Sequence, residues 1–253
     1  MRPYILAESN WKNIKDQKID LVVLPWGATE AHNYHLPYAT DNYQVDAIAA
    51  RSAELAHQKN ANVMLLPTVP FGVNTGQPDI RLNINLNPST QLQILRDIVT
   101  VLDRQNIRKL LVLNGHGGNN FKPLLREIGL EFPRLFLSLC NWYTTLDKSE
   151  FFDQQGDHAD EMETSLMLYL HSELVAPLSQ AGDGSEKKST VKGIREGWAW
   201  AERKWSLVTK DTGIGDPKSA SAQKGETYFK TLTEKLSGLM IDLADANPDN
   251  PYS

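Results

Sequence analysis

The sequence contains very little cysteine and no long apolar run, and each absence excludes a class of protein. Cys140 is the single cysteine among 253 residues, so no disulfide forms within the chain, and we expect it to be a buried structural thiol. No stretch approaches the roughly 20 apolar residues that cross a membrane. The opening MRPYILAESNWK has no apolar segment typical of a signal peptide. We therefore expect a cytoplasmic protein with no membrane partner.

Basic residues are outnumbered by acidic ones. The chain has 26 Lys and Arg against 31 Asp and Glu, for a net charge of -5 at pH 7. Nucleic acids and anionic surfaces bind clusters of Lys and Arg, and no such cluster is visible in the sequence. We therefore expect no nucleic-acid partner.

Short apolar runs alternate along the chain with segments whose apolar residues recur at helical spacing. Strand, turn and helix in this order are typical of a parallel sheet covered by helices, so we expect an α/β fold. The length allows one large domain or two small ones. The expected strands are residues 21–25, 63–67, 109–113 and 135–140, and the expected helices are residues 43–59, 88–105, 120–132, a helix after 160 that ends near 171, and 219–244.

A polar stretch follows the first expected strand and contains Glu30, His32, His35 and Asp41. Imidazole nitrogens and carboxylate oxygens are the ligands that divalent transition metals accept. Glu30 and His32 are two residues apart and share one face of an extended segment. Asp41 is also placed to cap the helix that follows. Each of these residues taken singly is more often a solvated loop side chain or a cap, so only their combination favours a site.

The third expected strand leads directly into Asn114-Gly115-His116-Gly117-Gly118-Asn119. The glycines allow a sharp turn that displays His116 at the end of the strand. A phosphate-binding loop is the alternative interpretation. It is less favoured, because neither glycine-rich phosphate motif is present and no Lys stands where it would meet a phosphate.

A second polar group precedes and begins the helix that ends near residue 171. Asp160 and Glu163 have the spacing of a capping box. On a helical wheel, however, Glu163 lies in the middle of an apolar stripe, where a carboxylate needs a compensating Arg or metal. His158, just before the helix, is free to project into the same cavity.

Two further segments are expected to be functional or to form contacts. The loop 68–87 is long for a compact domain, and such loops are usually functional. The segment 181–216 has three tryptophans close together, namely Trp198, Trp200 and Trp205. We expect it to be a lid or a subunit contact, although such aromatic clusters more often serve packing than substrate binding.

Taken together, the motifs resemble those of the creatininase (creatinine amidohydrolase) family. The resemblance rests on Gly27-Ala28-Thr29-Glu30-Ala31-His32, His35-Leu36-Pro37 with Asp41, Asn114 to Asn119, and His158 with Glu163-Thr164-Ser165. It implies one domain over residues 1–246 with a flexible tail at 247–253, built as a three-layer α/β/α sandwich around a mostly parallel sheet. It also implies a centre of two divalent metal ions (Zn, Mn or Fe) and a homo-oligomer, often a hexamer.

The resemblance further assigns roles to individual residues. Glu30, His32, Asp41 and His116 fall on metal-ligand positions, with Asp41 as the bridge, and His158 falls on a proton-transferring histidine. Trp142 falls on a substrate-contacting tryptophan, and we assign His35, Asn114 and Gly117 to substrate binding with it. The implied reaction is hydrolysis of a non-peptide C–N bond, in a cyclic amide or formamide, by a metal-bridging hydroxide. The small-molecule amide is the expected partner.

The sequence also departs from the family pattern. Creatininase has a glutamate ligand two residues after the histidine of the Asn-Gly-His motif, where this chain has Gly118. The loop 78–83 also differs from the usual one, and both departures argue against creatinine as the substrate. We expect Glu163 to replace the missing ligand, through volume that Gly118 leaves free, and to take part in catalysis. A non-catalytic metal-binding or assembly protein of the same fold is the alternative, and a phosphate-ester hydrolase is disfavoured by the lack of basic residues near the ligands.

Overall fold

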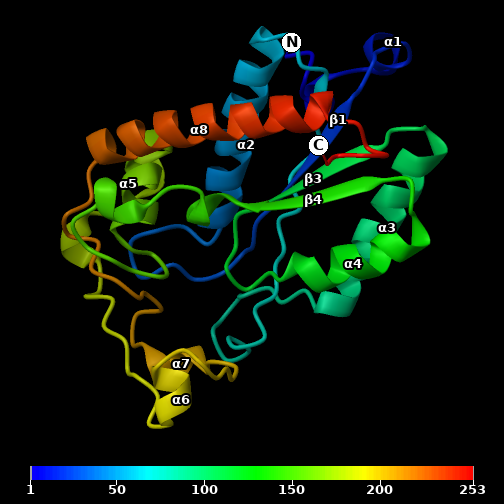
Figure 1. Ribbon diagram of the computed structural model, residues 1–253. Coiled ribbons are helices and arrows are strands. Elements are labelled where there is room, and N and C mark those ends of the chain that lie inside the picture. Colours follow the sequence, from blue (N-terminus) through cyan, green and yellow to red (C-terminus); the bar gives the residue numbers. More distant parts are fainter. Residues whose placement is uncertain (1, 253) are drawn as a thin grey trace.

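Figure 1 shows the computed structural model, which describes residues 2–252. Met1 and Ser253, the outer ends of the predicted domain and tail, lie outside the described residues. The centre of the fold is a parallel sheet with the strand order β2-β1-β3-β4. Its strands are β1 (Leu21–Trp26), β2 (Val63–Leu65), β3 (Lys109–Asn114) and β4 (Phe136–Asn141).

The carboxyl ends of the three longer strands lie at one level of the sheet. Trp26 pairs in register with Asn114, and Asn114 pairs with Asn141. In parallel α/β sheets, ligands bind at this edge, outside the carboxyl ends of the strands. The loops that follow β1 and β3 therefore meet in one place.

Helices cover both faces of the sheet, which confirms the predicted three-layer α/β/α arrangement. In Figure 1, α3 and α4 lie on one side of the strands and α2, α5 and α8 on the other. The α-helices are α1 (Trp11–Ile14), α2 (Thr40–Gln58), α3 (Pro88–Arg104), α4 (Phe121–Glu131), α5 (Glu161–Leu170), α6 (Lys192–Arg195), α7 (Trp205–Val208) and α8 (Ala222–Asp245). Short 3-10 helices span Leu6–Glu8, Trp142–Thr144, Lys148–Glu150, Ser172–Leu174 and Leu178–Gln180.

The two cores follow from the alternation of side chains along the strands. Leu21 and Val23 of β1 point to the core shared with α2 and α8, whereas Val22 and Leu24 point to the core shared with α3 and α4. Both faces of β1 are thus apolar, as expected for a strand buried on both sides. This packing holds the strand ends in fixed positions.

Two local expectations are corrected. Asp41 does not cap α2, because Thr40 already begins the helix and Ala39 is the N-cap residue. Asp41 instead lies in the first turn, where the helix dipole favours a negative charge. Cys140 is only partly buried, because β4 is an edge strand whose residues all keep some exposure.

The segment 181–216, called the arm segment below, leaves the body of the molecule and returns to it. Figure 1 shows α6 and α7 projecting from the body. The returning part pairs with His158, in the loop that leads into α5. Ile214 donates its N–H to the carbonyl of His158 at 2.8 Å, and its own carbonyl accepts the N–H of His158 at 3.2 Å. Trp198 and Trp200 on this segment are exposed in the single chain. The subunit contact expected here stays a prediction.

The last described residues are held by one ion pair. Arg108 forms two hydrogen bonds with Asp249, at 2.6 and 2.9 Å. The flexibility of the tail stays a prediction. Within residues 2–252, no helix has the length and apolar character needed to cross a membrane.

Candidate metal centre

Four predicted ligand side chains converge at the carboxyl edge of the sheet. Glu30 and His32 lie in the loop after β1, His116 lies in the turn after β3, and Asp41 reaches the same place from α2. Glu30, His32, Asp41 and His116 are at most 6% exposed. The structure therefore gathers these residues, which are distant in sequence, into one buried cluster.

The first group of donors consists of His116, Glu30 and Asp41. Nδ1 of His116 lies 2.9 Å from Oε1 of Glu30 and 3.1 Å from Oδ2 of Asp41. Nε2 of His116 donates to the carbonyl oxygen of Val73 at 2.9 Å. A carbonyl oxygen only accepts, so a neutral His116 carries its proton on Nε2 and aims the Nδ1 lone pair at both carboxylates. Within residues 2–252, neither carboxylate oxygen accepts a hydrogen bond.

The second group consists of His32, Asp41 and Glu163. Nδ1 of His32 lies 3.0 Å from the carbonyl oxygen of Glu30, and Nε2 lies 3.1 Å from Oδ1 of Asp41. The ligand atoms of the three residues lie within 4.8 Å of one another. Asp41 therefore presents one carboxylate oxygen to each group, which is the geometry of a bridging carboxylate.

The electrostatics of this cluster call for a cation. Burial alone would lower the pKa of His32, but the negative charges of Asp41, Glu163 and Glu30 raise it to about 10. Burial raises the pKa of Glu163 to about 8, assisted by the charges of Asp41 and Asp160 and opposed by His32. Buried acids of this kind need a positive partner, which the protonated rings supply in the metal-free chain and which a divalent ion can replace. Imidazole and carboxylate donors, several of them oriented by backbone groups, fit divalent transition metals.

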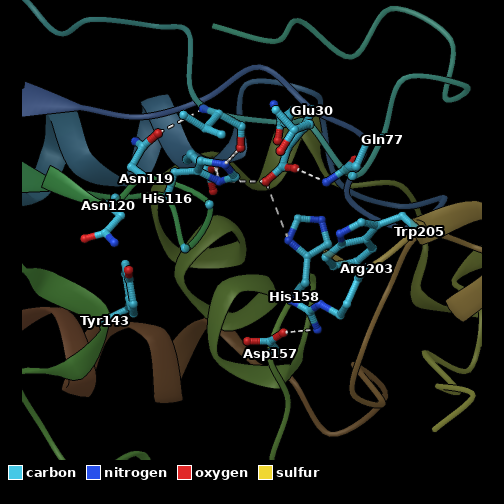
Figure 2. A pocket seen from close by; sticks show the side chains of 18 of the residues that line it. Glu30, Gln77, His116, Asn119, Asn120, Tyr143, Asp157, His158, Arg203 and Trp205 are labelled. Atoms are coloured by element: carbon cyan, nitrogen blue, oxygen red, sulfur yellow. Dashed lines mark hydrogen bonds and ion pairs between the residues drawn. The ribbon is translucent and has the colours of Figure 1, made fainter. Parts of the chain in front are cut away.

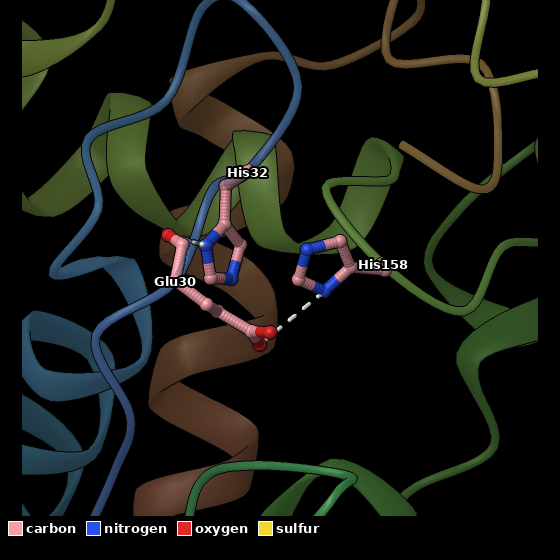
Figure 3. A group of neighbouring side chains, drawn as sticks. All are labelled: Glu30, His32 and His158. Carbon is pink, nitrogen blue, oxygen red and sulfur yellow. Dashed lines mark hydrogen bonds and ion pairs between the residues drawn. The ribbon is translucent and has the colours of Figure 1, made fainter. Parts of the chain in front are cut away.

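His158 lies beside the two groups and forms a third possible donor group with Glu30 and His32. Its Nε2 is 2.9 Å from the carbonyl oxygen of Ala31, so the neutral ring carries its proton there and leaves the Nδ1 lone pair free. Figure 3 shows this ring next to His32 and directed toward the carboxylate of Glu30, with Nδ1 3.7 Å from Oε1. Burial and the nearby His32 lower the pKa of His158. The ring is thus placed as a neutral proton acceptor.

A cavity of about 490 Å³ opens directly in front of this cluster. Its lining includes Glu30, Asp41, His116, His158 and Glu163, together with residues of the loop 68–87 and the arm segment. Figure 2 shows Trp205 and Arg203 of the arm segment on the side of His158. The Trp205 ring packs edge-on to His158 at a centroid distance of 5.0 Å. The arm segment therefore forms part of the cavity wall.

The residues assigned to substrate binding are divided between the cavity lining and the interior of the protein. Gly117 lines the cavity, but Trp142, His35 and Asn114 do not. Trp142 is fully buried in the core with α2 and α8. His35 is tied to Thr164 of α5 at 2.8 Å, and burial together with the charge of His32 lowers its pKa to about 4.

Asn114 has a structural role in the turn. Its Oδ1 accepts from the N–H of His116 at 3.1 Å and from Nδ2 of Asn119 at 3.0 Å. Its own amide donates to the carbonyl of His116 at 2.9 Å. These bonds hold the turn that displays the His116 ring. Asn114 therefore positions His116 without lining the cavity itself.

Gly118 is required by the position of His116. A Cβ at residue 118 would lie 2.2 Å from the carbonyl oxygen of Val73 and 2.5 Å from Nε2 of His116. The space beside Gly118 is therefore filled by the bond between these two groups and is not free for another carboxylate. Glu163 reaches the cluster from α5, on the side of His32, which corrects the expected path.

Several residues of the site were not predicted. Gln77 is buried and donates from Nε2 to Oε2 of Glu30 at 2.5 Å. Asn120 and Tyr143 line the cavity opposite Trp205 (Figure 2). The length of the loop 68–87 indicated a functional segment, but a single Gln, Asn or Tyr in a loop has no distinguishing sequence pattern.

Curated relatives of this chain are hydrolases by name. A mycofactocin precursor peptide peptidase of Mycobacterium ulcerans (strain Agy99) is 25% identical over 84% of this chain and 81% of that protein. A 3-dehydro-scyllo-inosose hydrolase of Thermotoga maritima is 26% identical over 94% and 82%, respectively. A creatinine amidohydrolase of Pseudomonas putida is 26% identical over 67% and 73%.

Solved structures share the fold. A Bacteroides fragilis NCTC 9343 protein, provisionally named creatinine amidohydrolase, is 43% identical, covers 98% of both chains and has a TM-score of 0.92. A Zn-Zn creatininase variant and a Mn creatininase superpose with TM-scores of 0.74 and 0.72 at 19% and 20% identity, over 93% of this chain and 96% of theirs. The family model described as creatinine amidohydrolase matches residues 7–240. The motifs, the fold and this match agree, and the chain belongs to the creatininase family.

Proposed function

We propose that this protein is a metal-dependent amidohydrolase that cleaves a non-peptide C–N bond in a cyclic amide or a formamide. One observation carries the proposal: the two carboxylate oxygens of Asp41 face two separate donor groups, one with His116 and Glu30, the other with His32 and Glu163. Each group fits one divalent ion, so the chain is suited to two. Zn, Mn and Fe all accept this mixture of nitrogen and oxygen donors.

Divalent ions bound by these residues would supply Lewis acidity to water and to the substrate carbonyl. In hydrolysis, an oxygen of water forms a bond to the carbonyl carbon, the C–N bond breaks, and a proton is transferred to the leaving nitrogen. The Nδ1 lone pair of His158 accepts a proton and returns it to that nitrogen, while the Nε2–H stays on the carbonyl of Ala31. Gln77 holds the second oxygen of Glu30 and so fixes the orientation of that carboxylate.

The named relatives support hydrolysis but differ in what they cleave. Their names specify a peptide, an inosose and creatinine, so hydrolysis is the feature that the names share. The cavity in front of the cluster is large enough for a small ring and its substituents, since ligand pockets commonly span about 300–1,000 Å³. A small amide is therefore a suitable substrate.

Stripping and reloading the protein tests this proposal. Chelator-treated protein is expected to hydrolyse neither dihydrouracil nor a small formamide, and reloading with Zn, Mn or Fe(II) is expected to restore turnover as the metal content approaches two ions per chain. Elemental analysis and product release are measured on the same samples. Undiminished turnover after metal removal, or saturation at one ion per chain, would contradict the two-ion proposal.

A further inference from the structure

The lining of the cavity contains polar groups that have no partner in the protein. Within residues 2–252, the amide of Asn120 forms no side-chain hydrogen bond, and Nδ2 of Asn141 donates none. The hydroxyl of Tyr143 accepts a long bond of 3.4 Å from Asn114 but donates none. Leaving such groups against an apolar ligand costs about 1–3 kcal/mol each.

The cations that line the cavity are already paired. Arg203 bonds to Asp157 at 2.7 Å, and Lys148 lies 3.6 Å from Asp160. A substrate anion would have to compete with these carboxylates for both cations. The free recognition groups of the cavity are therefore uncharged amides and a hydroxyl.

An aromatic side chain completes the lining. Trp200 of the arm segment borders the cavity and is 81% exposed, so its ring is open to a ligand. An indole offers an apolar body that packs on the C–H face of a ring compound. Figure 2 shows Asn120 and Tyr143 on one side of the cavity and the arm-segment residues Arg203 and Trp205 on the other. A ligand between the two sides meets hydrogen-bonding groups and an aromatic surface together.

We infer that the substrate is an uncharged ring compound carrying several hydroxyl groups, such as an amide of an aminosugar, held between the Asn and Tyr groups and the arm segment. This inference rests on the proposed amidohydrolase function and specifies its substrate class. Hydroxyl groups both donate and accept, so they satisfy the amide of Asn120, Nδ2 of Asn141 and the hydroxyl of Tyr143 together. Asn120 and Tyr143 are then specificity-determining residues.

Three formamides that release the same product test the inference. Metal-loaded protein is assayed for formate release from N-formylglucosamine, N-formylcyclohexylamine and N-formylglucosamine 6-phosphate. We expect kcat/KM for the first to exceed that for the second by at least about 100-fold, because a site that hydrogen-bonds a substrate hydroxyl rejects an analogue lacking it. The phosphorylated probe is expected to be poorer than the first. Equal values for the first two probes, or preference for the phosphate, would overturn the inference.

Two substitutions locate the selectivity. Asn120→Ala and Tyr143→Phe are expected to lower kcat/KM for N-formylglucosamine roughly tenfold each and to leave N-formylcyclohexylamine unchanged. Asn120 precedes α4 but its side chain does not cap that helix, so its truncation spares the fold. Tyr169→Phe is the matched control, because Tyr169 lies on α5 outside the cavity and its ring packs on Phe229. Equal effects on both probes would show a structural role and overturn the assignment.

Binding separates this inference from the proposed function. If metal-loaded protein releases no formate from any probe, saturation-transfer NMR is carried out with N-formylglucosamine, myo-inositol and N-formylcyclohexylamine. One outcome is that both hydroxylated rings bind, that Tyr143→Phe weakens their binding, and that the cyclohexyl compound does not bind. This outcome would support the substrate class even though the amidohydrolase proposal had failed. Absence of binding by both hydroxylated rings would overturn the substrate class itself.

Discussion

His116 donates from Nε2 to the main-chain carbonyl of Val73, 43 residues earlier in the chain, and this bond passes through the space next to Gly118. The family pattern has a metal-binding glutamate at this position. Here a side chain at residue 118 would displace either the carbonyl or the imidazole. The missing glutamate and the His116 orientation are therefore one structural feature.

A methyl group at this glycine is expected to weaken one metal site. In Gly118→Ala the Cβ would lie 2.5 Å from Nε2 of His116, so the ring must turn away from Glu30 and Asp41. Loss of such an orienting contact typically lowers metal affinity about 10–100-fold, which metal titration with a competing chelator measures. Gly117→Ala is the control, because a Cβ there meets nothing within 4 Å. Equal affinities in the two variants would disprove the argument.

Three charge-removing substitutions test how many metal ions each proposed ligand holds. Glu163→Gln and Glu30→Gln each keep the side-chain shape and are expected to reduce bound metal by about one ion per chain, whereas Asp41→Asn is expected to reduce it by about two, because Asp41 faces both groups. Elemental analysis is combined with circular dichroism to establish that each variant is folded. If Glu163→Gln retains both ions, Glu163 is not a ligand. Its role would then be structural, because its carboxylate accepts a hydrogen bond from the N–H of Ala159 just before α5.

Removal of the His158 ring, the proposed proton carrier, should lower turnover without lowering metal content. His158→Ala is expected to lower kcat roughly 10²- to 10⁴-fold with unchanged metal content. His57→Ala on the exposed part of α2 is the control. His158 also lies within reach of a donor group with Glu30 and His32, so loss of an ion in the variant would identify the ring as a ligand instead.

Metal binding should release protons. In the metal-free chain, burial opposes protonation of His116, but Glu30 and Asp41 raise its pKa well above the ordinary value, and the pKa of His32 is raised to about 10. At pH 7 both rings are therefore protonated and must lose a proton to bind an ion. Apparent affinity is expected to increase as the pH rises toward these pKa values, and calorimetric enthalpies are expected to vary with the ionisation enthalpy of the buffer. Enthalpies independent of the buffer would contradict this.

Two glycines of α8 should respond in opposite directions. A Cβ on Gly225 would lie 2.0 Å from the carbonyl oxygen of Ser165, where α8 packs on α5, whereas a Cβ on Gly238 meets nothing within 4 Å. Gly225→Ala is expected to destabilise the protein by about 1–3 kcal/mol through overpacking. Gly238→Ala is expected to stabilise it by up to about 1 kcal/mol through helix propensity. Urea unfolding measures both, and a neutral Gly225→Ala would show that the two helices separate easily.

The sequence was sufficient to predict the layers and the gathering of the candidate ligand side chains. Apolar runs such as Leu21–Trp26 indicated buried parallel strands, and polar residues directly after two such strands indicated one edge of the sheet. Glu163 was found because a carboxylate on an apolar helix face is costly. These predictions depend on local patterns, which a single chain displays.

The cavity wall could not be predicted in the same way. The family resemblance assigned Trp142 to substrate binding. Whether a side chain at the end of this strand turns into the core or into the cavity depends on α2 and α8, which pack against it. Trp205 reaches the cavity because its N–H bonds to the carbonyl of Gly76 and the arm segment returns to pair at Ile214. Contacts of this kind join residues that are distant in sequence, and they leave no periodic pattern in the sequence.

The three histidines of the site share a feature that bears on how the substrate can change during evolution. Each has one ring nitrogen next to a main-chain carbonyl, of Glu30, Ala31 or Val73. A carbonyl is present whatever the side chain, so substitutions at Ala31 and Val73 that preserve the backbone leave the ring orientations intact. The reactive centre is in this respect insulated from mutation of its surroundings, and the cavity wall can diversify around it without rebuilding the chemistry.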